Sequence, residues 1–189
     1  SEDADTFYSV IWGGEDLHVG LYDETKDIRT VDDATIDRMV AMVPGLNDKM
    51  QILDIGAGYG GAMRRVVKAT GCTATCLNLS EIQNDTNRSK IQTAHLGHKI
   101  DVVHAAFEDI PLGDETQDVV WSQDAILHSD NREGVLAEVY RVLKPGGYFI
   151  FTDPQQADDV PEGALQAVYD RLQLNSLGSP GFYRRAGEA

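Results

Sequence analysis

The sequence predicts an α/β fold, built on a Rossmann-like, doubly wound and mainly parallel sheet. Two observations support this prediction. Five short β-rich runs alternate with segments of helical periodicity between residues 51 and 152. The first run leads through a glycine-rich turn, Gly56-Ala-Gly-Tyr-Gly-Gly61, into a helical segment, and a strand–turn–helix unit of this kind opens many doubly wound sheets.

The length and composition indicate one globular domain. A chain of 189 residues with 42% hydrophobic content can bury a core of its own, and no apolar run approaches the roughly 20 residues of a membrane helix. The two cysteines, Cys72 and Cys76, are too few for a disulfide framework and lack the histidines of a zinc pattern. We therefore expect two small buried side chains and no metal site. The acidic start at 1–5 does not resemble a secretory signal, so we expect the protein in a reducing cytoplasm.

The charge balance is strongly acidic. The sequence has 31 acidic and 16 basic residues, which gives a formal net charge of −15. Such a field repels phosphate backbones, so we do not expect a nucleic-acid partner. Two explanations of the excess stay open: a salt-rich cytoplasm that screens the self-repulsion, or an ordinary acidic protein.

The first predicted helix spans 32–43. Its apolar residues recur with the i, i+3, i+4, i+7 spacing of one helical face, and Pro44 and Gly45 end it. We expect 1–45 to form an N-terminal cap or lid segment and 46–189 to form the core of the single domain.

Five strands and four further helices follow along the chain. We expect the strands at 51–55, 73–79, 100–107, 118–123 and 148–152, and the helices at 62–70, after Ser80, at 132–143 and at 162–174. Gly71 is placed to end the first of these helices, and Ser80 with Gln83 forms a capping box at the start of the second. Lys144-Pro-Gly-Gly147 ends the third and turns the chain into the last strand.

The glycine turn after the first strand is the most informative motif. Gly56, Gly58 and Gly61 match the G-x-G-x-x-G spacing of dinucleotide-binding proteins, so a dinucleotide site is a competing interpretation. Asp54 argues against it, because a carboxylate inside the strand end would repel a pyrophosphate but would suit a cationic amino group or a sulfonium. Asn78 also argues against it, since a dinucleotide enzyme usually places Asp or Glu there to bind the ribose.

A second polar motif follows the third predicted strand. Glu108 and Asp109 lie there in an acidic loop, Phe107-Glu-Asp-Ile-Pro111, that could accept a hydrogen bond from an adenine amino group. A solvated turn is the alternative interpretation of the same two residues. The sequence contains no P-loop and no G-x-S-x-G nucleophile elbow.

Together these features resemble the superfamily of S-adenosylmethionine (SAM)-dependent methyltransferases. Asp54 with the glycines matches its nucleotide-binding motif, Glu108-Asp109 its adenine loop, and Leu143-Lys-Pro-Gly-Gly147 its turn into the fifth strand. The resemblance covers 46–154 and implies a Rossmann-like sheet of the methyltransferase type, with SAM as the cofactor. That sheet usually ends in two further strands, which we expect to be lacking because few residues follow Leu174.

Five segments extend the resemblance over nearly the whole chain. They are Ile11-Trp-Gly-Gly-Glu-Asp-Leu-His-Val-Gly-Leu-Tyr22, Cys76-Leu-Asn-Leu-Ser80, Trp121-Ser-Gln-Asp-Ala-Ile-Leu-His-Ser129, Phe151-Thr-Asp-Pro154 and Leu177-Gly-Ser-Pro-Gly-Phe-Tyr-Arg184. They resemble the sarcosine/dimethylglycine N-methyltransferases. This implies methylation of sarcosine and/or N,N-dimethylglycine toward glycine betaine, an osmolyte, and would explain the acidic composition by a salt-stressed cell that accumulates betaine.

The resemblance also implies a set of cofactor-binding residues. They are Trp12, His18, Asp54, Gly56, Gly58, Asn78, Leu79, Gln83, Glu108, Asp109 and Gln123. Asn78 departs from the acidic ribose ligand of the wider superfamily, and in this branch it would share the ribose with Gln83. Two alternatives stay open: Gln83 could act only in its capping box, and Trp12 and His18 could only pack in a lid.

The predicted catalytic residues come from the same resemblance and from the chemistry of methyl transfer to an amine. The reaction is an in-line displacement on a sulfonium, so positioning and desolvation supply most of the acceleration. The resemblance implies that Gln123 lies beside the reacting end of the cofactor. His128, which follows the fourth predicted strand, could lie over the amine, unless it is a structural residue at a helix start. Aromatic faces stabilise the cation that forms, and the candidates are Trp12, Tyr22, Trp121 and Tyr183.

The carboxylate of an amino-acid acceptor requires a cation, ideally a bidentate arginine. Arg184, inside a segment that resembles the family, is our prediction, and Arg171 is the alternative. The predicted catalytic set is therefore His128, Gln123, Tyr22 and Arg184.

Three functions are compatible with the sequence. The first is the betaine-forming N-methyltransferase. The second is a methyltransferase for another small molecule, such as a phosphobase, sterol or quinol, and the third is a truncated SAM-binding module without turnover. The expected partner is a small amine or amino-acid substrate, with neither membrane nor nucleic acid. The oligomeric state and the methylation steps performed stay open.

Overall fold

A five-stranded parallel sheet forms the centre of the protein in a computed structural model that describes residues 28–188. The strands are β1 (Gln51–Ile55), β2 (Thr73–Asn78), β3 (Ile100–His104), β4 (Gln117–Gln123) and β5 (Leu143–Thr152). Their order is β3-β2-β1-β4-β5, and every neighbouring pair is parallel. The reversal of strand order at β1 is the hallmark of a doubly wound sheet, so the predicted fold class is confirmed.

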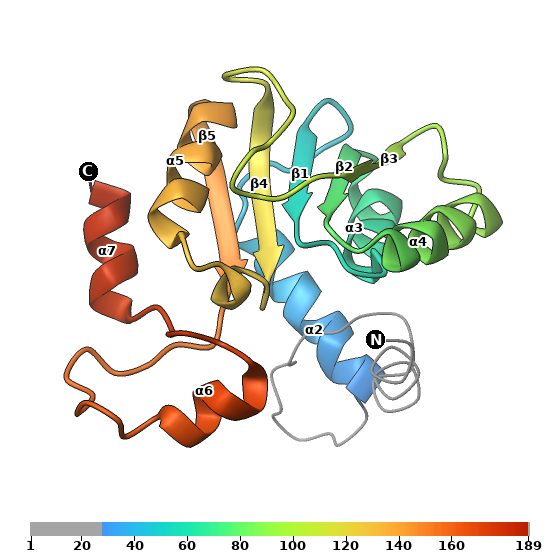
Figure 1. Cartoon of the computed structure of the whole chain (residues 1–189). Coiled ribbons are helices and arrows are strands. Elements are labelled where there is room, and N and C mark those ends of the chain that lie inside the picture. The colour runs from blue at the N-terminus through green and yellow to red at the C-terminus, as the bar shows by residue number, and fades with distance from the viewer. Residues whose placement is uncertain (1–27, 189) are drawn as a thin grey trace.

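Helices flank the sheet and continue beyond it. They are α2 (Ile28–Ala41), α3 (Gly61–Thr70), α4 (Glu81–Thr93), the 3₁₀ turn η1 (Ile126–His128), α5 (Arg132–Val142), α6 (Gln166–Leu172) and α7 (Pro180–Glu188). Figure 1 shows α4 at the β3 end of the sheet and α7 beyond α5 at the other end. None of the helices within 28–188 is long and apolar enough to cross a lipid bilayer.

The core consists of two apolar layers, one on each face of the sheet. Ile52 of β1 packs in a buried cluster with residues of α2, α3 and α4. Its neighbours Leu53 and Ile55 pack in a second buried cluster with the apolar side of α5. Side chains alternate between the two faces of a strand, so β1 is apolar on both sides, as expected for the central strand of a covered parallel sheet.

Two strands differ from the prediction by more than one residue at an end. The third ends at His104 rather than at 107, so Phe107 lies in the following loop. The fifth begins at Leu143 rather than at 148, because Leu143 already pairs with Gln117 before an irregularity shifts the register. The sequence Pro-Gly-Gly therefore forms a bulge inside β5 and not a turn that precedes it.

The predicted helices also need two corrections. α2 starts at Ile28, earlier than the predicted 32–43, and α6 covers only part of the predicted 162–174. α7 was not predicted, because two glycines lower its helix propensity. Its start nevertheless has a recognisable signal: the Ser179 hydroxyl accepts a hydrogen bond from the Phe182 N–H, and Pro180 is the first helical residue.

The two cysteines lie in the core, as predicted. Cys72 and Cys76 are both free and fully buried. Burial raises the pKa of the Cys72 thiol, because the thiolate loses its solvation. Both side chains therefore act as small hydrophobic groups.

Gly56 ends β1 in a conformation that only glycine adopts easily. Its φ is +81°, and its N–H donates to the Leu77 carbonyl of β2 at 2.8 Å. A Cβ atom at this position would lie 2.3 Å from the Cβ of Ala125, in the turn that follows β4. The absent side chain therefore lets the turns after β1 and β4 touch.

We expect Gly56→Ala to lower the free energy of unfolding by about 2–4 kcal/mol, from the left-handed backbone and the overpacking combined. Urea unfolding followed by circular dichroism measures this change. Gly97→Ala is the matched control, because a Cβ atom at Gly97 would have nothing within 4 Å, and it should change stability by less than about 0.5 kcal/mol. A loss at position 56 no larger than the control's would contradict the close approach.

Candidate functional site

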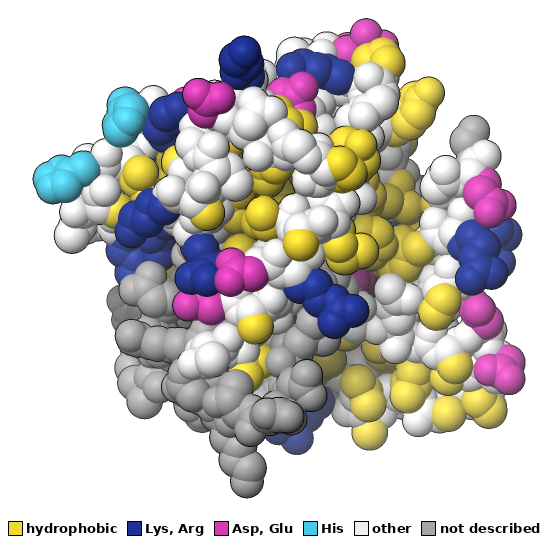
Figure 2. Space-filling view, turned by 180° about the vertical axis from the view of Figure 1, so that it is seen from behind, with side chains coloured by type: hydrophobic (Ala, Val, Ile, Leu, Met, Phe, Trp, Pro, Cys, Tyr) yellow, Lys and Arg dark blue, Asp and Glu magenta, His cyan; other side chains and the backbone are white. Residues whose placement is uncertain are grey.

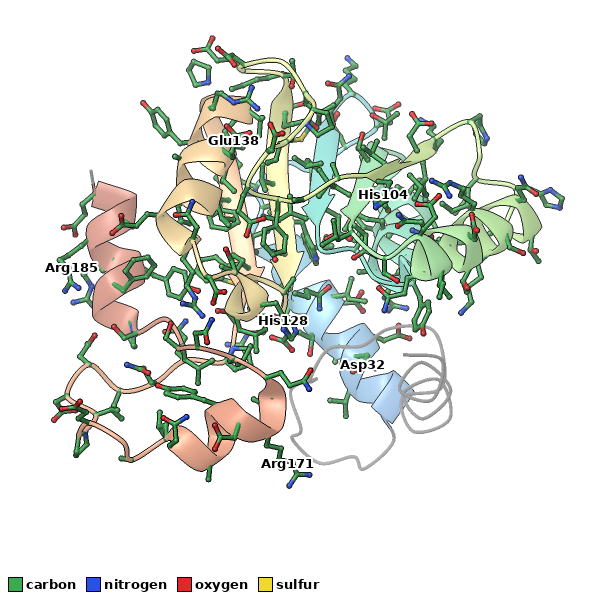
Figure 3. All side chains as sticks on the ribbon, viewed as in Figure 1. Asp32, His104, His128, Glu138, Arg171 and Arg185 are labelled. Carbon is green, nitrogen blue, oxygen red and sulfur yellow. The ribbon has the colours of Figure 1, made fainter. Side chains whose placement is uncertain are left out.

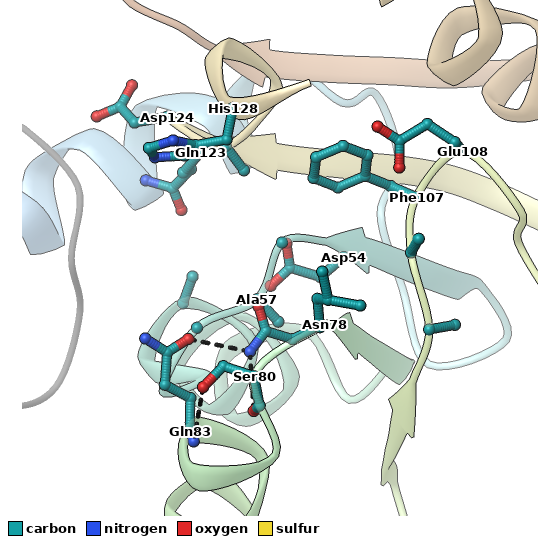
Figure 4. A pocket seen from close by; sticks show the side chains of 17 residues that line it. Asp54, Ala57, Asn78, Ser80, Gln83, Phe107, Glu108, Gln123, Asp124 and His128 are labelled. Carbon is teal, nitrogen blue, oxygen red and sulfur yellow. Dashed lines mark hydrogen bonds between the residues drawn. The ribbon is translucent and has the colours of Figure 1, made fainter. Parts of the chain in front are cut away.

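A cavity of about 330 Å³ lies at the carboxyl ends of the strands. Residues that follow β1, β2, β3 and β4 all line it, and Figure 4 shows their side chains pointing toward a common space. This volume lies at the lower end of the range of small-molecule sites. Ligands of doubly wound sheets bind at this edge, beside the strand where the order reverses.

Asp54 is the most deeply buried charged side chain of the pocket wall. It is the penultimate residue of β1 and is 3% exposed. Its backbone is fixed between two strands, opposite Cys76 of β2 and Trp121 of β4. A buried carboxylate is costly unless donors or cations surround it, so the pocket has a fixed negative group suited to a cationic ligand.

Asn78 and Gln83 form a polar pair at the end of β2. The Asn78 Nδ2 donates to Gln83 Oε1 at 3.0 Å and to the Ser80 carbonyl at 3.4 Å. The Gln83 backbone N–H donates to the Ser80 hydroxyl at 3.5 Å, which is the first half of the predicted capping box. The Gln83 side chain turns to Asn78, so the pair can present an amide acceptor and an amide donor to a ligand with vicinal hydroxyls.

Gln123, the last residue of β4, has a buried donor without a partner. Its Oε1 accepts a hydrogen bond from Trp121 Nε1 at 2.9 Å, and its buried Nε2 makes no hydrogen bond with any of the described residues, 28–188. An unsatisfied buried donor costs about 1–3 kcal/mol. Because Gln123 lines the cavity, this donor indicates a place where a ligand acceptor would bind.

The contact between Trp121 and Gln123 also corrects a prediction. Trp121 was a candidate aromatic face for the cation, but its side chain is fully buried in the core layer that contains α2 and α3. Its indole therefore cannot touch a ligand. It orients the amide of Gln123 instead.

His128 lies at the end of η1 and lines the cavity. Figures 3 and 4 show it near the carboxyl end of β4, above Gln123. Asp124, which lies between Gln123 and His128 in the sequence, also lines the cavity and was not among the predicted site residues. It has a φ of +49°, and its Oδ1 accepts a hydrogen bond from the Thr152 hydroxyl at 3.0 Å. Its place directly after β4 was the signal that could have identified it.

The acidic loop after β3 contributes one of its two carboxylates. Glu108 lines the cavity, and its Oε1 accepts a hydrogen bond from the Ser129 hydroxyl at 2.6 Å. Asp109 is exposed and lies outside the cavity wall. Leu79, also predicted, does line the cavity and is 67% exposed, which places it at the rim.

The structure brings neither of the two candidate arginines to the cavity. Arg184 is exposed on α7, and Arg171 is exposed on α6. Figure 3 shows Arg171 pointing away from the rest of the chain. Tyr183, a candidate aromatic face, donates its hydroxyl to Asp153 and is not part of the cavity wall. The predicted residues Trp12, His18 and Tyr22 lie outside the described residues.

An ion pair on α5 holds the loop that carries Glu108. The Ile110 N–H donates to Glu138 Oε2 at 2.9 Å, and Arg141 donates to the carbonyls of Ile110 and Leu112, each at 2.8 Å. Arg141 also pairs with Glu138 at 2.7 Å. The hydrogen bond from Arg141 lowers the pKa of the Glu138 carboxyl, against the opposing effect of desolvation.

We expect Glu138→Gln to reduce the free energy of unfolding by about 1–2 kcal/mol at neutral pH, because it removes charge-assisted hydrogen bonds. The folded-state pKa is lowered, so the stabilisation is complete above the ordinary value of 4.5 and is lost as the pH falls through the lowered value. Urea unfolding at neutral pH and at about pH 3 should show the difference from wild type shrinking. Glu162→Gln, at an exposed position, should show neither effect. A difference independent of pH would contradict the role of the charge.

Known proteins are similar to this chain in sequence and fold. A family model described as a methyltransferase domain matches residues 53–151. The sarcosine/dimethylglycine N-methyltransferase of Halorhodospira halochloris is 50% identical over 186 residues, which is 98% of this chain and 67% of that protein. The chain is a member of the sarcosine/dimethylglycine N-methyltransferase family of SAM-dependent methyltransferases. It spans about two thirds of the length of that relative.

Two further comparisons agree with this membership. A crystal structure described as a "putative sarcosine dimethylglycine methyltransferase from Galdieria sulphuraria" superposes with a TM-score of 0.92 and is 40% identical, covering 98% of this chain and 72% of that one. A sterol 24-C-methyltransferase of Candida albicans is 33% identical over 143 residues, which is 76% of this chain and 38% of that protein. The methyltransferase has therefore far greater similarity to the N-methyltransferases than to that sterol enzyme.

Proposed function

We propose that this methyltransferase binds SAM in the cavity and transfers its methyl group to the amine nitrogen of sarcosine and/or N,N-dimethylglycine, toward glycine betaine. The observation that carries the proposal is the meeting of a buried carboxylate, Asp54, and an unpartnered buried donor, Gln123 Nε2, in one cavity. A cofactor that has both an ammonium and a carboxylate can place its positive group near Asp54 and give the Gln123 donor an acceptor.

The remaining wall fits the rest of the same cofactor. The pair of Asn78 and Gln83 suits a ribose diol, and Glu108 with the rim residue Leu79 suits an adenine. Gly56 and Gly58 have positive φ values and let the cofactor approach the backbone after β1. When bound, SAM supplies an electrophilic methyl group on a sulfonium. Asp109, exposed outside this wall, keeps at most a long-range electrostatic role.

The acceptor side is formed by His128, Gln123 and Asp124. A tertiary or secondary amine must present its lone pair, and an imidazole nitrogen of His128 can take the proton from the ammonium form. The Asp124 carboxylate stabilises the positive charge that moves from sulfur to nitrogen. Tyr22, outside the described residues, is proposed as an aromatic face for the same charge. The exposed Arg184 would need to move to bind the acceptor carboxylate.

The cellular role follows from the acceptor. We propose synthesis of a compatible solute in the cytoplasm of a cell exposed to salt. The net charge of −15 supports this, because high ionic strength shortens the Debye length and reduces self-repulsion. On the face shown in Figure 2, Lys and Arg side chains alternate with Asp and Glu and form no continuous basic patch.

An acceptor panel tests the proposal. Methyl transfer from radiolabelled SAM is measured with glycine, sarcosine, dimethylglycine, phosphoethanolamine and a sterol, at low and high salt, with SAM binding followed by calorimetry. We expect turnover with sarcosine or dimethylglycine. Turnover only with phosphoethanolamine or only with the sterol would mean that the acceptor is a phosphobase or a sterol and not an N-methylated glycine. SAM binding without any turnover would mean that these 189 residues form a binding module.

We expect Asp54→Ala to weaken SAM binding at least tenfold, equivalent to about 1.4 kcal/mol, because the mutation removes the buried carboxylate of the cavity. Isothermal titration calorimetry on the folded variant measures this. Asp101→Ala, at an exposed position in β3, is the control and should bind SAM as the wild type does. An unchanged affinity of Asp54→Ala would refute its contact with the cofactor.

A further inference from the structure

We propose that Asp153 and Arg132 are positioning residues that hold His128 at the cavity by fixing the backbone of Leu127 from two sides. This inference rests on the proposed function, since it gives His128 its place relative to the methyl acceptor. Neither residue lines the cavity itself.

The turn that carries His128 has little support of its own. η1 is three residues long, and its internal hydrogen bonds are two: His128 N–H to the Ala125 carbonyl at 3.1 Å and Ser129 N–H to the Ile126 carbonyl at 2.9 Å. Short 3₁₀ turns have poor hydrogen-bond geometry. The position of His128 therefore depends on contacts from outside the turn.

Those contacts meet at Leu127, directly before His128. Its N–H donates to Asp153 Oδ1 at 2.9 Å, and its carbonyl accepts from an Arg132 guanidinium nitrogen at 3.0 Å. Both backbone polar groups of this residue are thus satisfied by side chains rather than by regular structure. Fixing them restricts the adjoining peptide planes and, with them, the direction in which the next side chain projects.

Asp153 is held firmly enough to act as an anchor. It directly follows β5, which ends at Thr152 opposite Gln123 of β4, so it lies on the same edge of the sheet as the turn it supports. Its second oxygen, Oδ2, accepts a hydrogen bond from the Tyr183 hydroxyl of α7 at 2.6 Å. Tyr183 packs in turn against Phe151, with ring centroids 4.9 Å apart.

Arg132 is anchored from a different direction. It is the first residue of α5, and its guanidinium donates to both the hydroxyl and the carbonyl of Ser176. Ser176 belongs to the segment between α6 and α7. Asp153 therefore links the turn that carries His128 to α7, and Arg132 links it to the segment between α6 and α7.

The test compares Asp153→Ala with Asp153→Asn, which keeps an acceptor for the Leu127 N–H. Asp153→Ala should lower kcat about ten- to hundredfold and leave the SAM dissociation constant within about threefold of wild type. Exchange of the Leu127 amide with deuterium, followed by NMR, should become at least about tenfold faster, and the NMR signals of the His128 ring should move. Asp153→Asn should retain slow exchange and most of kcat.

Two controls keep the result specific. Asp159→Ala changes an exposed aspartate of the same loop and should alter none of the four readouts. Arg132→Gln removes the guanidinium donor to the Leu127 carbonyl and should lower kcat in the same way. This variant tests the proposal if Asp153→Ala does not fold.

Two outcomes in Asp153→Ala would overturn the proposal. One is an unchanged Leu127 exchange rate or unchanged His128 ring signals. The other is a rise in acceptor KM with kcat unchanged, which would mean direct binding of the acceptor. The measurements of amide exchange and of the His128 ring signals need no acceptor. They therefore decide the positioning role even where the wild-type chain methylates none of the acceptors offered.

Discussion

The contact between Gly56 and Ala125 is the constraint on which the site depends. It joins the turn after β1 to the turn after β4, with no room for a side chain between them. Asp54 lies just before the first turn and Gln123 just before the second. The closeness of the turns therefore sets the separation of the Asp54 carboxylate and the Gln123 amide in the cavity wall. The parallel sheet supplies the remaining geometry, since the carboxyl ends of its strands meet at one edge.

The polar side chains of the cavity share one design. The Asn78 amide is held by Gln83 and by the Ser80 carbonyl, Glu108 by Ser129, and Gln123 by Trp121, each through one or two hydrogen bonds. Each group then keeps further hydrogen-bonding capacity for a ligand. Such pairing fixes side-chain rotamers before a ligand arrives, which lowers the entropic cost of binding. Preorganisation matters most for methyl transfer, because the reaction relies on positioning more than on acid–base chemistry.

The sequence alone predicts those parts of the fold and of the site that depend on local patterns of residues. The glycine turn, the strand ends and the residues that follow them could be placed because apolar runs and turn residues have short-range causes. Trp121, Asp109 and α7 could not, because their environments depend on distant segments. The side chain of Trp121 is directed inward by the pairing of β4 with β1 and β5, and α7 starts with Gly181 bonded to Asp158, 23 positions away.

The buried pairing of Trp121 with Gln123 gives the cavity an internal optical probe. The indole is shielded from water, and its N–H is bonded to the amide that faces the cavity. The emission of a buried indole depends on the polarity around its nitrogen. A ligand that accepts a hydrogen bond from Gln123 Nε2 therefore changes the fluorescence emission of Trp121. With Trp12 replaced by phenylalanine, Trp121 is the one tryptophan of the sequence, and its fluorescence reports occupancy of the cavity without any label.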